Sequence, residues 1–292
     1  MPRIALWQFT ASDDPAVNLD HVRSGVAAAR AEGARVVMFP EATMARFGTR
    51  LAALAEPLDG PWASEVAAIA DRAGVVVIAG MFTPAEADRV YNTLLVTGQG
   101  QHTAYHKIHL YDAFGFFESR TVARGAQPLT VDVAGIRLGL ATCYDVRFPE
   151  LFQALADRGA TAIAVPASWG AGQGKREQWE LLVRARALDS GCWVAGCGQA
   201  DPAASGIEVS GKAPTGIGHS LVADPFGRVH DSLDAGPGML LVDIDDELAH
   251  SSRRATGVLA NRVLGAQAGD GVAPRPGVTS DPSPDPAQEP SG

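Results

Sequence analysis

Apolar residues follow two patterns along most of the chain. Short uninterrupted runs such as Val36–Phe39 are typical of buried strands, whereas Pro15–Glu32 carries Ala, Val and Leu at helical spacing. The expected strands span Ile4–Phe9, Arg35–Phe39, Val75–Met81, Tyr91–Thr97, Gln101–His106, Ile136–Ala141, Thr161–Val165, Cys192–Cys197, His219–Asp224, Arg228–His230 and Met239–Ile244, and the expected helices span Pro15–Glu32, Ser64–Ala73, Pro149–Arg158 and Lys175–Ser190. Strands that alternate with amphipathic helices indicate a layered α/β domain.

Glycine and proline mark where several of these elements should end. Gly74 follows an expected helix, and Pro40 and Pro166 each follow an expected strand. Gly98-Gln99-Gly100 predicts the turn of a hairpin. The stretch Asp201–Pro214 is rich in small residues and is expected to form a surface loop.

The composition changes from about Gly265 onward, where Gly, Pro, Ser, Asp and Ala dominate. Such a segment buries too little apolar surface to offset its ordering entropy. We therefore expect one domain over residues 1–264 and a disordered tail, separate from any chemistry, over residues 265–292.

The charge of the chain narrows its expected partners. The 292 residues carry a formal net charge of −9, with no cluster of Lys and Arg, which argues against nucleic acid or an anionic membrane as partner. The longest apolar runs, such as Gly74–Met81, are too short to span a bilayer. No basic segment followed by a long apolar one opens the sequence, so no signal peptide is predicted and a cytoplasmic location is expected.

Cysteine and histidine usage gives no sign of disulfides or of a metal. The three cysteines, Cys143, Cys192 and Cys197, are odd in number and form no CxxC pair, and the seven histidines form no HExxH motif. Cys192 and Cys197 lie in an apolar stretch and are expected to be small core residues.

Three polar residues each follow an expected strand. Glu41 comes directly after Phe39-Pro40, Lys107 follows Gln101–His106, and Cys143 follows Ile136–Ala141 by two positions. Because open α/β sheets bind ligands beyond the carboxyl ends of their strands, these three side chains could converge in one pocket.

An acid, a base and a thiol suit nucleophilic attack on an amide. The thiol of Cys143 must lose its proton to attack carbon, and a buried Glu41 carboxylate could accept it. The Lys107 ammonium and the backbone N–H of Tyr144 could stabilise the negative oxygen that results. Glu41 would then protonate the departing ammonia, and water would cleave the thioester.

Each of these residues also has an ordinary structural interpretation. A cysteine after an apolar strand is usually a core residue, a lysine is usually a solvated charge, and a glutamate after proline is often a turn or cap residue. The combination favours chemistry.

Three stretches around these residues resemble the Glu–Lys–Cys signature of the nitrilase, or carbon–nitrogen hydrolase, superfamily. They are Phe39-Pro40-Glu41, His106–Asp112 and Thr142–Glu150, in the superfamily's order and rough spacing. The resemblance covers about residues 2–262. It implies a four-layer αββα sandwich with mixed sheets in a single domain, a homodimer or larger homo-oligomer, and neither a metal nor an organic cofactor.

The resemblance also points to supporting residues. Glu118 matches a second glutamate of the superfamily, which lies near the lysine and helps to place substrate and water; otherwise Glu118 is a surface acid. Arg147 could bind a substrate carboxylate or form an ion pair, for example with Glu150. Trp169 could form a pocket wall or simply pack in the core.

The segment Gly170–Lys175 looks superficially like a phosphate-binding loop, but Trp169 stands where the first glycine is needed and Arg176 where Ser or Thr would bind magnesium. We expect a flexible loop before a helix, at the rim of the pocket.

The segment Cys143–Glu150 and the helix Gln178–Ala187 look most like the omega-amidase and deaminated-glutathione amidase branch, although relatives usually carry His where this chain has Gln178. The leading hypothesis is hydrolysis of a primary amide on a small carboxylated substrate. An N-carbamoyl amino acid hydrolase and a nitrilase remain alternatives. So do a catalytically idle binding or regulatory protein of the same fold and a redox sensor built on Cys143.

Overall fold

The computed structural model describes residues 1–209, 211 and 213–263. Its strands are β1 (Arg3–Gln8), β2 (Val36–Met38), β3 (Val76–Pro84), β4 (Val90–Gly98), β5 (Gln101–His106), β6 (Asp112–Ala113), β7 (Phe116–Phe117), β8 (Val122–Ala123), β9 (Leu129–Val133), β10 (Ile136–Leu140), β11 (Ala162–Ala167), β12 (Trp193–Gly198), β13 (Leu221–Ala223), β14 (Val229–Ser232) and β15 (Gly238–Asp243). Its helices are α1 (Pro15–Ala31), α2 (Leu51–Leu54), α3 (Pro61–Ala73), α4 (Pro149–Asp157), α5 (Lys175–Ser190) and α6 (Asp246–Thr256), together with the 3₁₀ helices η1 (Glu118–Arg120), η2 (Cys143–Arg147) and η3 (Ala203–Ser205).

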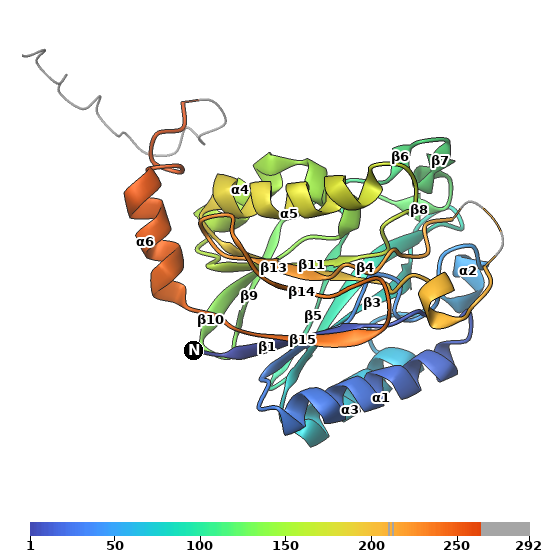
Figure 1. Cartoon of the computed structure of the whole chain (residues 1–292). Helices are drawn as coiled ribbons and strands as arrows, with labels where there is room; N and C mark the ends of the chain where they lie inside the picture. The colour runs from blue at the N-terminus through green and yellow to red at the C-terminus, as the bar shows by residue number, and fades with distance from the viewer. Residues whose placement is uncertain (210, 212, 264–292) are drawn as a thin grey trace, which may run out of the picture. The chain divides into compact units, whose positions relative to one another are not determined.

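Two mixed sheets form the centre of the domain. The first sheet has the order β15-β1-β2-β3-β4-β5, with β8 beside β4, and the second has the order β14-β13-β12-β11-β10-β9. Helices α1 and α3 cover the outer face of the first sheet, and α4 and α5 cover the outer face of the second (Figure 1). The predicted four-layer αββα sandwich is therefore confirmed.

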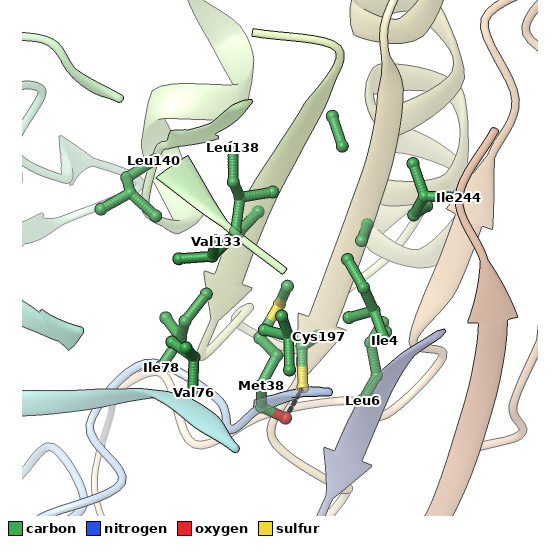
Figure 2. Close-up of a cluster of buried hydrophobic side chains, with 14 of the residues drawn as sticks. Ile4, Leu6, Met38, Val76, Ile78, Val133, Leu138, Leu140, Cys197 and Ile244 are labelled. Atoms are coloured by element: carbon green, nitrogen blue, oxygen red, sulfur yellow. Dashed lines mark hydrogen bonds between the residues drawn. The ribbon is translucent and has the colours of Figure 1, made fainter. Parts of the chain in front are cut away.

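The central strands are apolar on both faces because each sheet lies between two layers. In β1, Ile4 and Leu6 pack between the sheets, whereas Ala5 packs under the helices. In the second sheet, Leu138 and Cys197 enter the same core between the sheets (Figure 2). Burial on both faces explains why the strands read as continuous apolar runs in the sequence.

The central strands of each sheet run parallel and thereby set the position of the polar residues that follow them. Strands β1, β2 and β3 are parallel in the first sheet, and β10, β11 and β12 are parallel in the second. Ser168, directly after β11, donates its backbone N–H to Glu41, three residues after β2, at 2.7 Å. The carboxyl ends of strands from both sheets thus meet at one place.

The predicted hairpin is confirmed. Gly98 pairs with Gln101 across β4 and β5, and Gln99 and Gly100 form the turn with φ values of +54° and +79°. Positive φ at both turn residues matches the right-handed twist of the flanking strands.

Some expected strand ends are wrong: β3 runs on from Met81 to Pro84, and β11 continues through Pro166 to Ala167. Ala164 accepts a hydrogen bond from Ala141 just beyond β10, and Pro166 has the same orientation two residues later. Strand β10 ends at Leu140, so no strand residue lies opposite Pro166 on that side. The missing N–H of Pro166 therefore costs no hydrogen bond between the two strands.

Several short or polar elements lack a clear pattern in the sequence. Strands β6, β7 and β8 have two residues each, too few to show a period. Helix α6 is largely polar, and its buried residues are only Ala249 and Ser252, so no apolar stripe marks it.

Among the residues that the structure describes, no helix is long and apolar enough to cross a membrane. The predicted tail, residues 265–292, lies outside the described residues.

Candidate active site

Cys143 lies at a sharp bend between strand and helix. Strand β10 ends at Leu140, Thr142 is still extended, and Cys143 begins η2 with a φ of +46°. This left-handed conformation costs a non-glycine residue about 1–2 kcal/mol, so the surroundings must hold it in place. The Asp145 carboxylate accepts a hydrogen bond from the Thr142 N–H at 2.9 Å and so stabilises the bend.

Glu41 is fully buried and its carboxylate is bound on both oxygens. Oε1 accepts hydrogen bonds from Asn92 Nδ2 at 2.7 Å and from Lys107 Nζ at 3.0 Å. Oε2 accepts the Ser168 N–H. The carboxylate is therefore fixed in one orientation.

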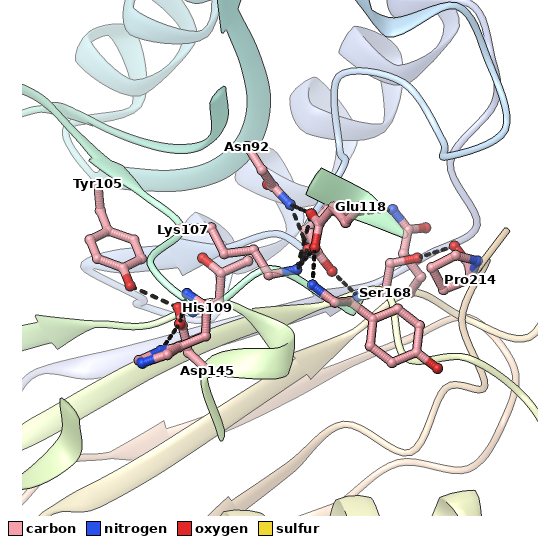
Figure 3. Close-up of polar contacts among 12 residues, drawn as sticks. Asn92, Tyr105, Lys107, His109, Glu118, Asp145, Ser168 and Pro214 are labelled. Atoms are coloured by element: carbon pink, nitrogen blue, oxygen red, sulfur yellow. Dashed lines mark hydrogen bonds and ion pairs between the residues drawn. The ribbon is translucent and has the colours of Figure 1, made fainter. Parts of the chain in front are cut away.

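Lys107 is 2% exposed and joins Glu41 to a second carboxylate. Its Nζ lies 2.9 Å from Glu118 Oε2, and Asn92 Nδ2 also donates to Glu118 Oε1 at 3.0 Å (Figure 3). Glu118, itself 2% exposed, is thus a buried partner of Lys107 and not a surface acid. We call Glu41, Lys107, Glu118 and Asn92 the ion cluster.

Electrostatics in the ion cluster keep the lysine charged and the cysteine protonated. Burial alone would lower the pKa of Lys107, but the charges of Glu118 and Glu41 outweigh it and hold that pKa well above its usual range. Burial, together with the negative charge of Glu41, raises the pKa of the Cys143 thiol well above its usual range, although Lys107 opposes this.

A recess brings these groups together. It is lined by Glu41, Phe47, Lys107, Tyr111, Phe116, Glu118, Cys143, Tyr144, Ser168, Trp169, Gly170, Lys175 and Pro214. The three residues that follow strands in the sequence therefore do converge, and Tyr144 and Trp169 lie in the wall.

Arg147 stands just behind this wall. Its guanidinium lies over the Trp169 ring at 5.2 Å, and its Nη2 donates to Gln178 Oε1 at 2.7 Å. Within the described residues Arg147 forms no ion pair with Glu150. The ion pair with Glu150 is therefore absent, and the Arg147 guanidinium binds the neutral Gln178 amide instead.

Asp145 is a site residue that the sequence did not single out. Its buried carboxylate accepts hydrogen bonds from Tyr105 Oη at 2.7 Å and from the His109 N–H at 2.9 Å (Figure 3). Tyr105 and His109 lie two residues on either side of Lys107. Asp145 therefore ties the lysine segment to the bend at Cys143, a role that only its tertiary contacts reveal.

Two further members of the site, Asn92 and Lys175, were also missed. Asn92 lies inside β4 and looks like an ordinary strand residue in the sequence. Lys175 begins α5, as the sequence predicts, but its burial (8% exposed) and its place in the lining of the recess were not expected.

The comparison with known families agrees with this site. The carbon–nitrogen hydrolase family matches residues 3–254, and the chain belongs to that family. A hydrolase of Mycobacterium tuberculosis is 54% identical over 266 residues, covering 89% of this chain and 95% of the relative. An Arabidopsis thaliana omega-amidase is 32% identical, covering 86% and 69%. A deaminated glutathione amidase of Escherichia coli O157:H7 is also 32% identical, covering 89% and 96%.

Solved structures share the same fold. Nit3 of Saccharomyces cerevisiae, a member of the nitrilase superfamily, has a TM-score of 0.75 at 25% identity, covering 87% of this chain and 94% of its own. A cysteine-to-alanine mutant of an amidase of Nesterenkonia sp. AN1, solved in complex with butyramide, has a TM-score of 0.73 at 27% identity, covering 88% of this chain and 95% of its own. The resemblance to the superfamily is thereby confirmed.

Gly80 leaves room for the backbone at Glu41, and this predicts a local defect on substitution. A methyl group at position 80 would lie 2.4 Å from the Ala42 nitrogen and 2.8 Å from the Glu41 carbonyl carbon. We expect Gly80→Ala to lower the free energy of unfolding by about 1–3 kcal/mol in urea titrations.

Gly236→Ala is the matched control, because its added methyl would come no nearer than 4.0 Å to Ala204. Its free energy of unfolding should change by no more than about 0.5 kcal/mol. Equal losses in both variants would contradict the proposed crowding at Glu41.

Proposed function

We propose that this carbon–nitrogen hydrolase is an amidase that releases ammonia from a small carboxylated amide, through a thioester on Cys143. One observation carries the proposal. A charged lysine, a carboxylate and a thiol that lie far apart in the sequence line one recess, with the lysine and the carboxylate in direct contact.

The reaction begins with transfer of the thiol proton from Cys143 to Glu41. Because the pKa of Cys143 is raised, the resting enzyme holds a thiol, and this transfer accompanies attack on the amide carbon. The sulfur–carbon bond forms while the carbonyl π electrons move to oxygen, which becomes negatively charged.

Two donors are available to that oxygen. Lys107 Nζ is charged and lines the recess. The Tyr144 N–H stands at the start of η2 and has no acceptor among the described residues, as expected for the first turn of a helix. Preorganised donors of this kind supply a large part of the rate enhancement in acyl transfer.

Collapse of the intermediate breaks the carbon–nitrogen bond, and Glu41 returns the proton to the leaving ammonia. Water then attacks the thioester, Glu41 accepts a proton from it, and the free acid leaves as the thiol is restored. The net change is amide plus water to acid plus ammonia. Glu118 keeps Lys107 in place and is available to orient the water.

Support for a carboxylated amide comes from two sides. The omega-amidase and the deaminated glutathione amidase among the relatives are named for amide hydrolysis. Arg147, beside the Trp169 wall, is the candidate partner of the substrate carboxylate. Homo-oligomer formation and a cytoplasmic location stay predictions.

Replacing Cys143 with Ala tests the nucleophile. We expect ammonia release to fall about 1,000-fold or more, because no other thiol lines the recess. Cys192→Ala, which removes a thiol buried outside the recess, should leave the rate within a few-fold. Retained ammonia release by Cys143→Ala would reject the mechanism, provided circular dichroism shows both variants folded.

A substrate panel separates the amidase from its alternatives. We expect succinamate or glutaramate to give a higher kcat/KM than an N-carbamoyl amino acid or a nitrile. The measurement is ammonia release combined with carbon dioxide release. Only a carbamoyl substrate yields both products, so a preference for that substrate would establish the alternative hydrolase. A panel without any turnover would favour the idle binding protein or the redox sensor.

A further inference from the structure

Lys175 is a mostly buried cation at the recess that the proposed chemistry does not use. Its Nζ lies 3.5 Å from the Phe114 ring centroid, 5.6 Å from that of Tyr111 and 5.7 Å from that of Trp169. Within the described residues, the one hydrogen bond of the Nζ atom goes to Tyr111 Oη and is 3.5 Å long. In the part of the chain that the structure describes, Lys175 has no carboxylate partner.

Arg147 is a second cation that lies beside the Trp169 wall with an aromatic ring as its neighbour. Both cations lie over the Trp169 ring, at 5.2 Å for Arg147 and 5.7 Å for Lys175. The hydrogen bond that Arg147 donates goes to the neutral amide of Gln178, and its Nε is buried without an acceptor. Lys175 is buried and Arg147 is partly buried, and both face aromatic rings in place of carboxylates. Such an arrangement is costly unless a ligand supplies the negative charge.

The recess has opposite charges on its two sides. In the ion cluster, the carboxylates Glu41 and Glu118 outnumber the ammonium of Lys107 and leave one net negative charge beside Cys143. Lys175 and Arg147 make the Trp169 side positive. An anionic group is therefore repelled from the thiol and attracted to the Trp169 side, whereas a neutral amide carries no such penalty beside the thiol.

We infer that Lys175, reinforced by the positive charge of Arg147 behind the Trp169 wall, forms an anion subsite that binds the substrate carboxylate and so orients the amide toward Cys143. This inference rests on the proposed function and adds a residue that determines specificity. A substrate bound in this way places its amide next to the ion cluster and keeps its carboxylate on the Trp169 side. The recess would then select monoamides of short dicarboxylic acids over neutral amides of equal length.

Amides that differ only in the carboxylate give the sharpest test. Succinamate and butyramide have the same chain, with a carboxylate in the first where the second has a methyl group. The quantity measured is the ratio of their kcat/KM values, which cancels a general loss of catalytic power. Glutaramate and pentanamide repeat the comparison with one more methylene.

Lys175→Met should lower this ratio at least tenfold, mainly by raising KM for the carboxylated amide, because a charge-assisted hydrogen bond is lost. Lys175→Arg, which keeps the charge, should restore the ratio to within a few-fold of wild type. Arg176→Met is the matched control: it removes one positive charge from the next residue, whose side chain is 57% exposed and paired with Glu180. Its ratio should not change.

The outcomes separate this inference from the proposed function. Equal losses for both amides in Lys175→Met would show that Lys175 only positions the wall, and would overturn the inference while leaving the amidase intact. An unchanged ratio in Lys175→Met would overturn it as well. Absence of succinamate and glutaramate turnover in the wild type would reject the proposed substrate class itself.

A binding measurement tests the anion subsite even if the wild type does not turn over succinamate or glutaramate, because it requires no catalysis. We expect iodoacetamide to alkylate Cys143 slowly, and the concentration of glutarate that protects the thiol reports dicarboxylate binding, read by mass spectrometry. Lys175→Met should need at least tenfold more glutarate than wild type, whereas Arg176→Met should need the same amount. Equal protection in all three proteins would overturn the anion subsite whatever the substrate is.

Discussion

The site depends on a buried ammonium held between two carboxylates. Lys107, Glu41 and Glu118 are all withdrawn from water, and each would be costly to bury alone. These three charged groups pair with one another, and Asn92 donates a hydrogen bond to each of the two carboxylates. Removing one partner from such a cluster typically costs about 3–5 kcal/mol, because a buried charge is left unpaired. The cluster therefore fixes the geometry of the lysine and of the general base at the same time.

The scaffold delivers Cys143 to this cluster through a second buried carboxylate. Asp145 binds residues on both sides of Lys107 and also the backbone N–H just before Cys143. The lysine segment follows the first sheet and the cysteine bend follows the second, so Asp145 joins the two sheets where they meet. The left-handed conformation of Cys143 persists because these bonds surround it.

Much of this arrangement was predictable from the sequence, because buried strands have a strong local pattern. The runs before Glu41 and Cys143 are apolar on both faces, and the position of each polar residue at a strand end placed it at one edge of a sheet. The predicted strand ended too early, before Pro166. A proline is tolerated in a strand only where no neighbouring strand needs its N–H, and the pairing of strands cannot be read from the local sequence. For the same reason the sequence did not reveal the roles of Asn92, Asp145 and Lys175, because the residues that surround each of them are distant in sequence. The two-residue strands β6 and β7 are too short to carry any pattern.

The mechanism requires an ionised Glu41 beside a protonated Cys143. Burial is the main cause of the raised pKa of that thiol, and the negative charge of Glu41 is the second. The most direct measurement is the titration of Cys143 by the ultraviolet absorbance of its thiolate, with Cys143→Ala spectra subtracted. In Glu41→Gln, which removes the charge and keeps the shape, the midpoint should move to lower pH than in the wild type. A midpoint that stays in place or moves to higher pH, in a variant that circular dichroism shows to be folded, would contradict the account.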